Sequence, residues 1–272
     1  MKKKLLLFAL LLTGLLTGCI FDSDDEEKWD AAKVCPETGT NAYGMPNRGT
    51  FTDERDGEVY RYTTIGNQVW MAENLRYALP SPYSMCYGMR TCFRGPNYEE
   101  YKGDTLCRKD TVNLAEIAKR MNSSCTDNDC IAEEYCKKFG RYYALKEKIP
   151  NSNYSMLNRD VVDSVCPKGW HLPTEAEWQV LLIQIGEDLS RYLSDESQYF
   201  REPKIYLNEC SFSVLYGGFY SETKISELFY RAQFWSSTTG TYFASTAYFR
   251  GVNTDLGIAI DEGLHQIRCL KN

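Results

Sequence analysis

The residues best suited to chemistry gather in one stretch, CPKGWHLPTEAEWQVLL, at positions 166 to 182. It holds His171, Glu175 and Glu177, and a histidine beside two carboxylates could perform general acid–base catalysis. The same carboxylates also have a structural use. Thr174 and Glu177 have the spacing of a capping box, and Glu175 falls in the first helical turn, where negative charge favours the helix dipole. We favour the structural interpretation and expect no catalytic residue.

Histidine chemistry has a second possible source, because His171 and His265 would meet if the helix start lay against the last strand. Two imidazoles can bind a metal ion or pass a proton. The chain has only 2 histidines, however, and no repeated CxxC pairs to complete a zinc site. The sequence also lacks a phosphate loop, a nucleophile elbow and an HExxH helix. We therefore expect no metal site and no cofactor.

The N-terminus has the pattern of a bacterial export signal. Three lysines precede an apolar run at 5–12 that is too short to span a bilayer. The run leads to Leu-Thr-Gly-Cys, which resembles a lipoprotein cleavage box, so we predict a signal peptide at 1–18 and lipidation of Cys19, with palmitate among its acyl chains. Two or more acyl chains would hold the protein at a membrane. An acidic run follows, and 19–49 is predicted to be a flexible tether.

Cysteine content indicates disulfides. The chain has 11 cysteines, and removing Cys19 leaves an even number in a protein predicted to be exported. Oxidising compartments favour disulfide formation. Proximity along the chain suggests two pairs, Cys86 with Cys92 and Cys125 with Cys130.

Overall composition is that of a globular protein without a nucleic-acid surface. Hydrophobic residues make up 43% of the chain, which is enough for a large core. The formal net charge of -6 argues against nucleic acid as a partner, because phosphate binding needs a basic surface. The length allows one large or two small domains.

Hydrophobic patterns predict the elements that would position these residues. Two turn dipeptides, Asp-Gly at 56–57 and Gly-Asn at 66–67, predict strands at 58–65 and 68–71. A helix should begin at Thr174 and stop at Gly186, with a core-facing stripe formed by Trp178, Leu181, Leu182 and Ile185.

Further elements are predicted on either side of that helix. A second helical pattern runs through Leu114, Ile117, Ala118 and Met121. Aromatic and β-branched runs predict short strands at 212–216, 234–238, 247–250, 257–260 and 265–270. The stretch 147–161, rich in asparagine, is predicted to be a loop.

Several blocks occur in an order that resembles the Fibrobacter succinogenes major paralogous domain of bacterial exported proteins and lipoproteins. They are TFTDERDGEVYRYTTIGNQVWMAENL, CKKFGRYY, CPKGWHLPTEAEWQVLL, FWSSTT and IRCLKN. The segment at about 93–135 departs from the pattern and is interpreted as a cysteine-rich insertion. LPTEAEW is also similar to formylglycine-generating enzymes, whose fold is a variant of the C-type lectin-like architecture.

The resemblance implies a single large domain at 50–272, with an α+β fold of the C-type lectin-like, sulfatase-modifying-factor-like kind. Such a domain has antiparallel strands, few helices, long loops and disulfides, and its last strand pairs back into the sheet. Similar folds tie that strand to the early helix, which makes Cys166 and Cys269 a candidate disulfide. Formylglycine-generating enzymes need a close pair of reactive cysteines late in the domain, whereas Cys210 and Cys269 are far apart in this sequence.

A lectin-like fold also implies sugar binding as a hypothesis. Trp235, Ser236 and Ser237 are aromatic and polar enough to line a ligand surface. We expect a lipid-anchored cell-envelope protein, at the outer membrane, whose domain binds or displays without catalysis. Its expected partners are the membrane, through the anchor, and polysaccharide or another envelope component. The alternatives are an enzyme related to the formylglycine-generating group and a purely structural envelope protein.

Overall fold

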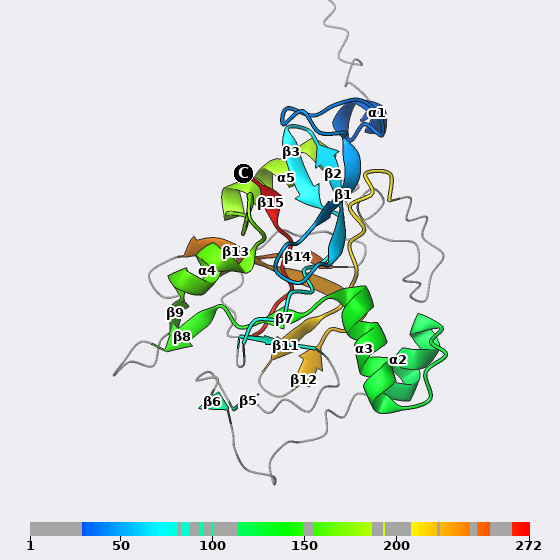
Figure 1. Cartoon of the computed structure of the whole chain (residues 1–272), viewed down its shortest axis with the longest axis vertical. Coiled ribbons are helices and arrows are strands. Elements are labelled where there is room, and N and C mark those ends of the chain that lie inside the picture. Colours follow the sequence, from blue (N-terminus) through cyan, green and yellow to red (C-terminus); the bar gives the residue numbers. More distant parts are fainter. Residues whose placement is uncertain are drawn as a thin grey trace, which may run out of the picture.

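The computed structural model describes residues 29–80, 83–86, 93–94, 99–100, 114–148, 155–186, 193, 208–221, 224–239, 244–250 and 263–272. The predicted signal peptide, Cys19, Cys92 and the predicted strand at 257–260 lie outside these ranges. The described part is a mixed α and β fold with mostly antiparallel sheets (Figure 1).

The main sheet has five strands in the order β1-β2-β3-β15-β10. These strands are β1 (Arg48–Thr52), β2 (Val59–Ile65), β3 (Gln68–Met71), β10 (Trp170–His171) and β15 (Leu270–Lys271). The predicted strands at 58–65 and 68–71 are thus confirmed as β2 and β3. Gly57 and Gly66 have φ of 79° and 55°, the left-handed values that tight turns require and that glycine adopts without strain.

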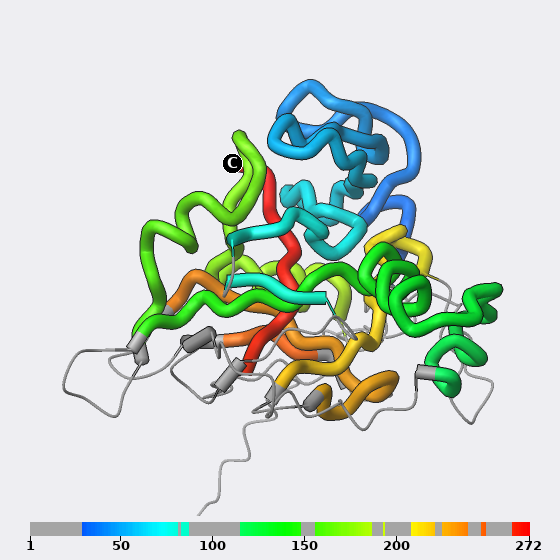
Figure 2. The backbone as a smooth tube through the Cα atoms, turned by 60° about the horizontal axis from the view of Figure 1, so that its bottom comes forward, coloured from blue at the N-terminus to red at the C-terminus, as the bar shows by residue number. Residues whose placement is uncertain are grey.

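The C-terminal strand β15 is inserted between two strands that come much earlier in the sequence. Leu270 pairs with Trp70 of β3 and with His171 of β10. Figure 2 shows this C-terminal segment, in red, crossing the middle of the molecule. The prediction that the chain end pairs back into the sheet is therefore confirmed.

The main sheet curls so that residues of its two edge strands touch. Phe51 of β1 stacks on Trp170 of β10 with ring centres 4.4 Å apart, although three strands separate them in the sheet. Tyr62 lies across Gly49, its register partner, and a Cβ at position 49 would come within 2.6 Å of the Tyr62 hydroxyl oxygen. Glycine at 49 is what lets the Tyr62 ring lie flat over β1.

Helix α5 (Glu175–Ile185) packs on one side of this sheet. It begins after Thr174 in a capping box with Glu177 and ends at Gly186, so both predicted boundaries are confirmed. Trp178 stacks on Phe234, with ring centres 5.5 Å apart, and meets Trp70 at 4.6 Å. The apolar stripe therefore faces the core, as its spacing predicts.

Two-stranded sheets complete the β structure. They are β4 (Ser84–Met85) with β7 (Tyr142–Tyr143), β5 (Phe93–Arg94) with β6 (Glu99–Glu100), β8 (Lys146–Lys148) with β9 (Ser155–Leu157), β11 (Phe219–Ser221) with β12 (Lys224–Ser226), and β13 (Arg231–Thr239) with β14 (Ala244–Arg250). The predicted strands at 234–238 and 247–250 lie within β13 and β14. The predicted loop at 147–161 is wrong, because it includes β9 and the start of α4 (Arg159–Val165), which Asn158 caps.

The predicted tether at 19–49 is too long. Helix α1 (Ala31–Val34) follows its cap Asp30, and β1 begins at Arg48. Cys35 is 1% exposed and bonded to Cys210, so this segment is part of the folded domain. Acidic composition ends at Glu27, and the residues after it include Trp29, Val34 and Cys35, which supply apolar surface to bury.

The predicted insertion at 93–135 ends inside a helix. Helix α2 (Leu114–Met121) is confirmed, and α3 (Asn128–Phe139) runs past the predicted boundary. Ile131 and Tyr135 of α3 are buried in a hydrophobic cluster with Phe139. Figure 1 shows α2 and α3 side by side at the lower right, with α3 nearer the centre of the fold.

Every cysteine in the described ranges forms a disulfide. The pairs are Cys35–Cys210, Cys86–Cys136, Cys125–Cys130 and Cys166–Cys269. Cys166 with Cys269 is the pair that the resemblance implied, and Cys125 with Cys130 is the pair that proximity suggested. Pairing of Cys86 with Cys92 is wrong, because β4 runs beside β7 and this carries Cys86 to the end of α3, where Cys136 lies.

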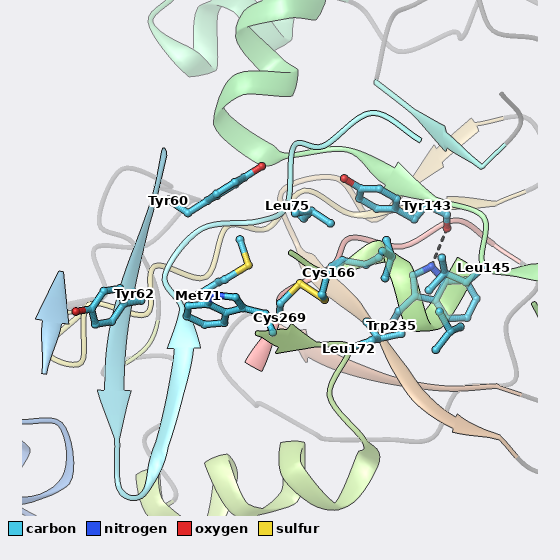
Figure 3. Packing of buried hydrophobic residues seen from close by; sticks show 14 of the residues in the cluster. Tyr60, Tyr62, Met71, Leu75, Tyr143, Leu145, Cys166, Leu172, Trp235 and Cys269 are labelled. Atoms are coloured by element: carbon cyan, nitrogen blue, oxygen red, sulfur yellow. Dashed lines mark hydrogen bonds between the residues drawn. A yellow bond between two sulfur atoms is a disulfide. The ribbon is translucent and has the colours of Figure 1, made fainter. Parts of the chain in front are cut away.

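Packing around Cys166–Cys269 joins the strands to helix α4. Figure 3 shows this disulfide among Met71, Leu172 and Trp235. Among the described residues, no helix has the length and apolar character needed to cross a bilayer.

Candidate functional site

The stretch whose residues are best suited to catalysis, 166–182, forms a helix cap. Glu177 accepts hydrogen bonds at Oε2 from the Thr174 amide (2.7 Å) and hydroxyl (2.8 Å), and its Oε1 lies 3.0 Å from His171 Nε2. Burial acts to raise the pKa of Glu177, but the bonds from Thr174 and His171 outweigh it and hold the pKa below its usual value. Both carboxylate oxygens are thus engaged in positioning the start of α5.

The two histidines have separate surroundings. His171 Nδ1 lies 2.8 Å from Asn272 Oδ1, so its ring links the helix cap to the last residue of the chain. His265 is fully buried and meets the Trp235 ring edge-on, with ring centres 4.7 Å apart. In the described ranges, no three residues of the types His, Cys, Asp and Glu are placed to hold a metal ion.

The predicted ligand surface at 235–237 is wrong for its principal residue. Trp235 is 0% exposed, and its indole N–H donates to the Tyr143 carbonyl over 2.7 Å (Figure 3). Ser236 is 1% exposed, and the half-buried Ser237 donates its amide to the Pro173 carbonyl. Residues 234–236 of the run are buried because β13 passes between β14 and the segment before β15. Composition alone does not show which side chains of a strand face solvent.

A different, mostly aromatic set of residues lies near the surface where the sheet closes on itself. We call it the seam surface, and it is made of Tyr43, Met45, Phe51, Tyr62, Trp170 and Lys271. Contacts connect its members: Trp170 stacks on Phe51 and lies 6.5 Å from Tyr62 between ring centres. Lys271 Nζ lies 5.4 Å from the centre of the Trp170 ring and donates to the Gly169 carbonyl. The Tyr43 hydroxyl donates to the Lys271 carbonyl.

Two polar atoms of the seam surface have no hydrogen bond within the described part of the chain. They are the hydroxyl of Tyr62 and the indole N–H of Trp170, from residues that are 6% and 7% exposed. Neither atom is enclosed by protein. Figure 3 shows the Tyr62 hydroxyl pointing away from the Cys166–Cys269 disulfide, and partial burial raises the pKa of this group. Both atoms are open to an external partner.

Sequence reasoning did not find this surface. Tyr62 lies in the predicted strand at 58–65, but Gly49 and Phe51 lie in β1, which was not predicted; in the paired strands alternation puts all three on one face. Their meeting with Trp170 depends on the curl of the sheet, and no local pattern specifies that curl. In the sequence, this surface is indicated only by its content of tyrosine, tryptophan and lysine.

Comparison with known proteins assigns the chain to a family. A family model described as the Fibrobacter succinogenes major domain matches residues 63–271. The chain belongs to this family. The match begins near the end of β2 and ends in β15, so it includes β3, α5 and the strand that closes the sheet and leaves out β1. No curated protein and no solved structure gives a significant match.

The seam surface combines residues from inside and outside the matched region. Trp170 and Lys271 belong to the major domain, whereas Tyr43, Phe51 and Tyr62 precede the first matched residue. The segment before the match is therefore joined to the major domain both by this aromatic contact and by Cys35–Cys210.

Proposed function

We propose that this chain is a cell-envelope lipoprotein whose domain binds a polysaccharide or another envelope component without catalysis. The observation that carries the proposal is the seam surface, where two polar atoms have no hydrogen-bond partner among the described residues and the Tyr43 ring is exposed. Binding sites of this kind are largely apolar, with a few polar groups that fix orientation.

The disulfides favour binding over thiol chemistry. Cys210 and Cys269, the late cysteines compared with formylglycine-generating enzymes, are bonded to Cys35 and Cys166. A reactive cysteine needs an accessible thiolate, and these sulfurs are buried in disulfides. Both bonds instead tie distant segments into a rigid unit.

We infer further that the domain has a C-type lectin-like architecture. Three features support this inference: the return of β15 into the sheet, the helix that follows the His-Leu-Pro segment, and the link from Cys166 to the last strand. A fold of this type does not by itself specify a ligand, so the proposed function depends on the surface and not on the architecture.

Membrane attachment is proposed to occur at Cys19, through acyl chains added after removal of residues 1–18. Replacing Cys19 with Ser should abolish metabolic labelling of the protein by palmitate in the producing bacterium. The same variant should move from the membrane fraction to the soluble fraction, because the acyl chains supply the membrane affinity. Unchanged labelling of the Cys19→Ser variant would show that the anchor is elsewhere or absent.

Binding is tested by retention of the full chain on envelope polymers. The Cys19→Ser chain, kept soluble in this way, should be retained on at least one of a panel of insoluble polysaccharides and purified cell-wall material. Reduced and alkylated protein serves as the control, since it lacks the disulfides that order the domain. Absence of retention on every polymer would favour a purely structural envelope role.

A further inference from the structure

The polar atoms of the seam surface are held in place before any ligand arrives. The Tyr62 ring rests over Gly49, which has no side chain to displace it, and lies against Trp170. Trp170 is in turn fixed by its stack on Phe51. Side chains that are already ordered lose little conformational entropy on binding. Little of the favourable free energy of hydrogen bonds formed here is therefore offset by ordering.

The hydrogen-bonding capacity of these atoms matches a hydroxyl-bearing ligand. The Trp170 indole N–H is a donor only, whereas the Tyr62 hydroxyl can both donate and accept. Sugar hydroxyls do both as well, so neighbouring hydroxyls of one ring can accept from Trp170 and exchange a hydrogen bond with Tyr62. The Tyr43 ring, 43% exposed, adds an apolar face, and its hydroxyl donates to the carbonyl of Lys271, the register partner of Trp170.

Charge on the seam surface favours a neutral ligand. Lys271 is its one charged side chain, and its ammonium already donates to the Gly169 carbonyl and lies over the Trp170 ring. An anionic polymer would be expected to meet several cations. The surface instead offers aromatic rings and uncharged polar atoms.

We propose that the seam surface binds a hexopyranose unit of a neutral glycan. The Tyr62 hydroxyl and the Trp170 indole N–H form hydrogen bonds to ring hydroxyls, and Tyr43 packs against the C–H face of the same or the next sugar. This inference rests on the proposed function and specifies its ligand class and its contacts.

The test compares two tyrosines on the same strand. Tyr62→Phe removes a hydroxyl that has no hydrogen-bond partner in the described ranges, while Tyr60→Phe removes one that accepts the Arg76 amide over 2.9 Å. Both variants are made in the full Cys19→Ser chain. Binding is measured by calorimetry with neutral tetrasaccharides of glucose, mannose, xylose and N-acetylglucosamine, and stability is measured by urea unfolding.

We expect Tyr62→Phe to weaken binding about threefold to tenfold, the value of one uncharged hydrogen bond, and to leave stability unchanged. Tyr60→Phe should lower stability and leave binding unchanged. Tyr43→Ala should also weaken binding, with little effect on stability, because its ring is exposed.

Three results would overturn the inference while leaving the proposed function intact. These are equal binding by wild type and Tyr62→Phe, retention only on charged polymers, and retention that is lost at high salt. Failure of the wild-type chain to bind any tetrasaccharide or polymer would reject the proposed function as well, and would leave both polar atoms as hydrated groups only.

Discussion

At the residue scale, neighbouring tyrosines on one strand have opposite uses. Tyr60 is fully buried and its hydroxyl accepts the Arg76 amide, whereas the Tyr62 hydroxyl points outward over Gly49. Burial raises the pKa of Tyr60 to about 12 from its ordinary value of 10.0, although Arg76 acts to lower it. Burial also raises the pKa of the Tyr143 hydroxyl.

This difference predicts alkaline destabilisation that depends on Tyr60. The unfolded chain ionises near pH 10.0 and the folded chain near 12, so the contribution of Tyr60 is complete below pH 10.0 and is lost as pH rises through that interval. The free energy of unfolding should fall by up to about 1.4 kcal/mol per pH unit from this group. In Tyr60→Phe the decline should be shallower, at a cost of about 1 kcal/mol near neutral pH for the lost hydrogen bond.

Urea unfolding at a series of pH values measures this effect. Tyr62→Phe is the matched control and should keep the wild-type slope more closely, because the Tyr62 hydroxyl reaches solvent. Parallel loss of stability by wild type and Tyr60→Phe above pH 10.0 would mean that other groups cause the alkaline transition.

At the element scale, the disulfides differ in what they join. Cys166–Cys269 connects the end of α4 to the segment that leads into β15, across 103 residues. Cys125–Cys130 spans 5 residues between the end of α2 and the first turn of α3. A longer closed loop restricts the unfolded chain more strongly.

Removing the two disulfides should therefore have unequal costs. By the loop-closure argument, Cys166→Ala with Cys269→Ala should lower the free energy of unfolding by about 4 to 5 kcal/mol, and Cys125→Ala with Cys130→Ala by about 2 kcal/mol. The urea midpoints of the two double variants are compared. If the variant without Cys166–Cys269 does not fold at all, that result also shows the larger loss of stability. A larger loss from the Cys125 and Cys130 pair would contradict the placement of β15 at the centre of the fold.

At the scale of the whole molecule, the C-terminal segment organises the core. Arg268 is fully buried, donates to Asn74 Oδ1 over 2.8 Å and also to the carbonyls of Phe212 and Ser213. Gln266, two residues earlier, donates to the Phe139 carbonyl at the end of α3. Polar side chains just before β15 therefore join the end of α3, the segment after β3 and the segment before β11. The sequence alone does not show that this arginine is buried and hydrogen-bonded in this way.

Local rules were sufficient for elements whose signals are local. Turn glycines and alternation specified β2 and β3, and the capping box with its apolar stripe specified α5 from Thr174 to Gly186. The loop predicted at 147–161 failed because a short hairpin and a seven-residue helix depend on packing against the rest of the fold. The predicted C-terminal end of the tether is wrong because Cys35 forms a disulfide with Cys210, 175 residues away.

The sequence by itself determined the family, the antiparallel α+β class and the start and end of the principal helix, because each depends on motifs or on residues close together in the chain. Only the tertiary structure decided that Trp235 is buried and that Tyr62 and Trp170 meet at the surface. The curl that brings β1 against β10 arises from packing across strands far apart in sequence, so which side of an aromatic strand faces solvent is a property of the assembled sheet.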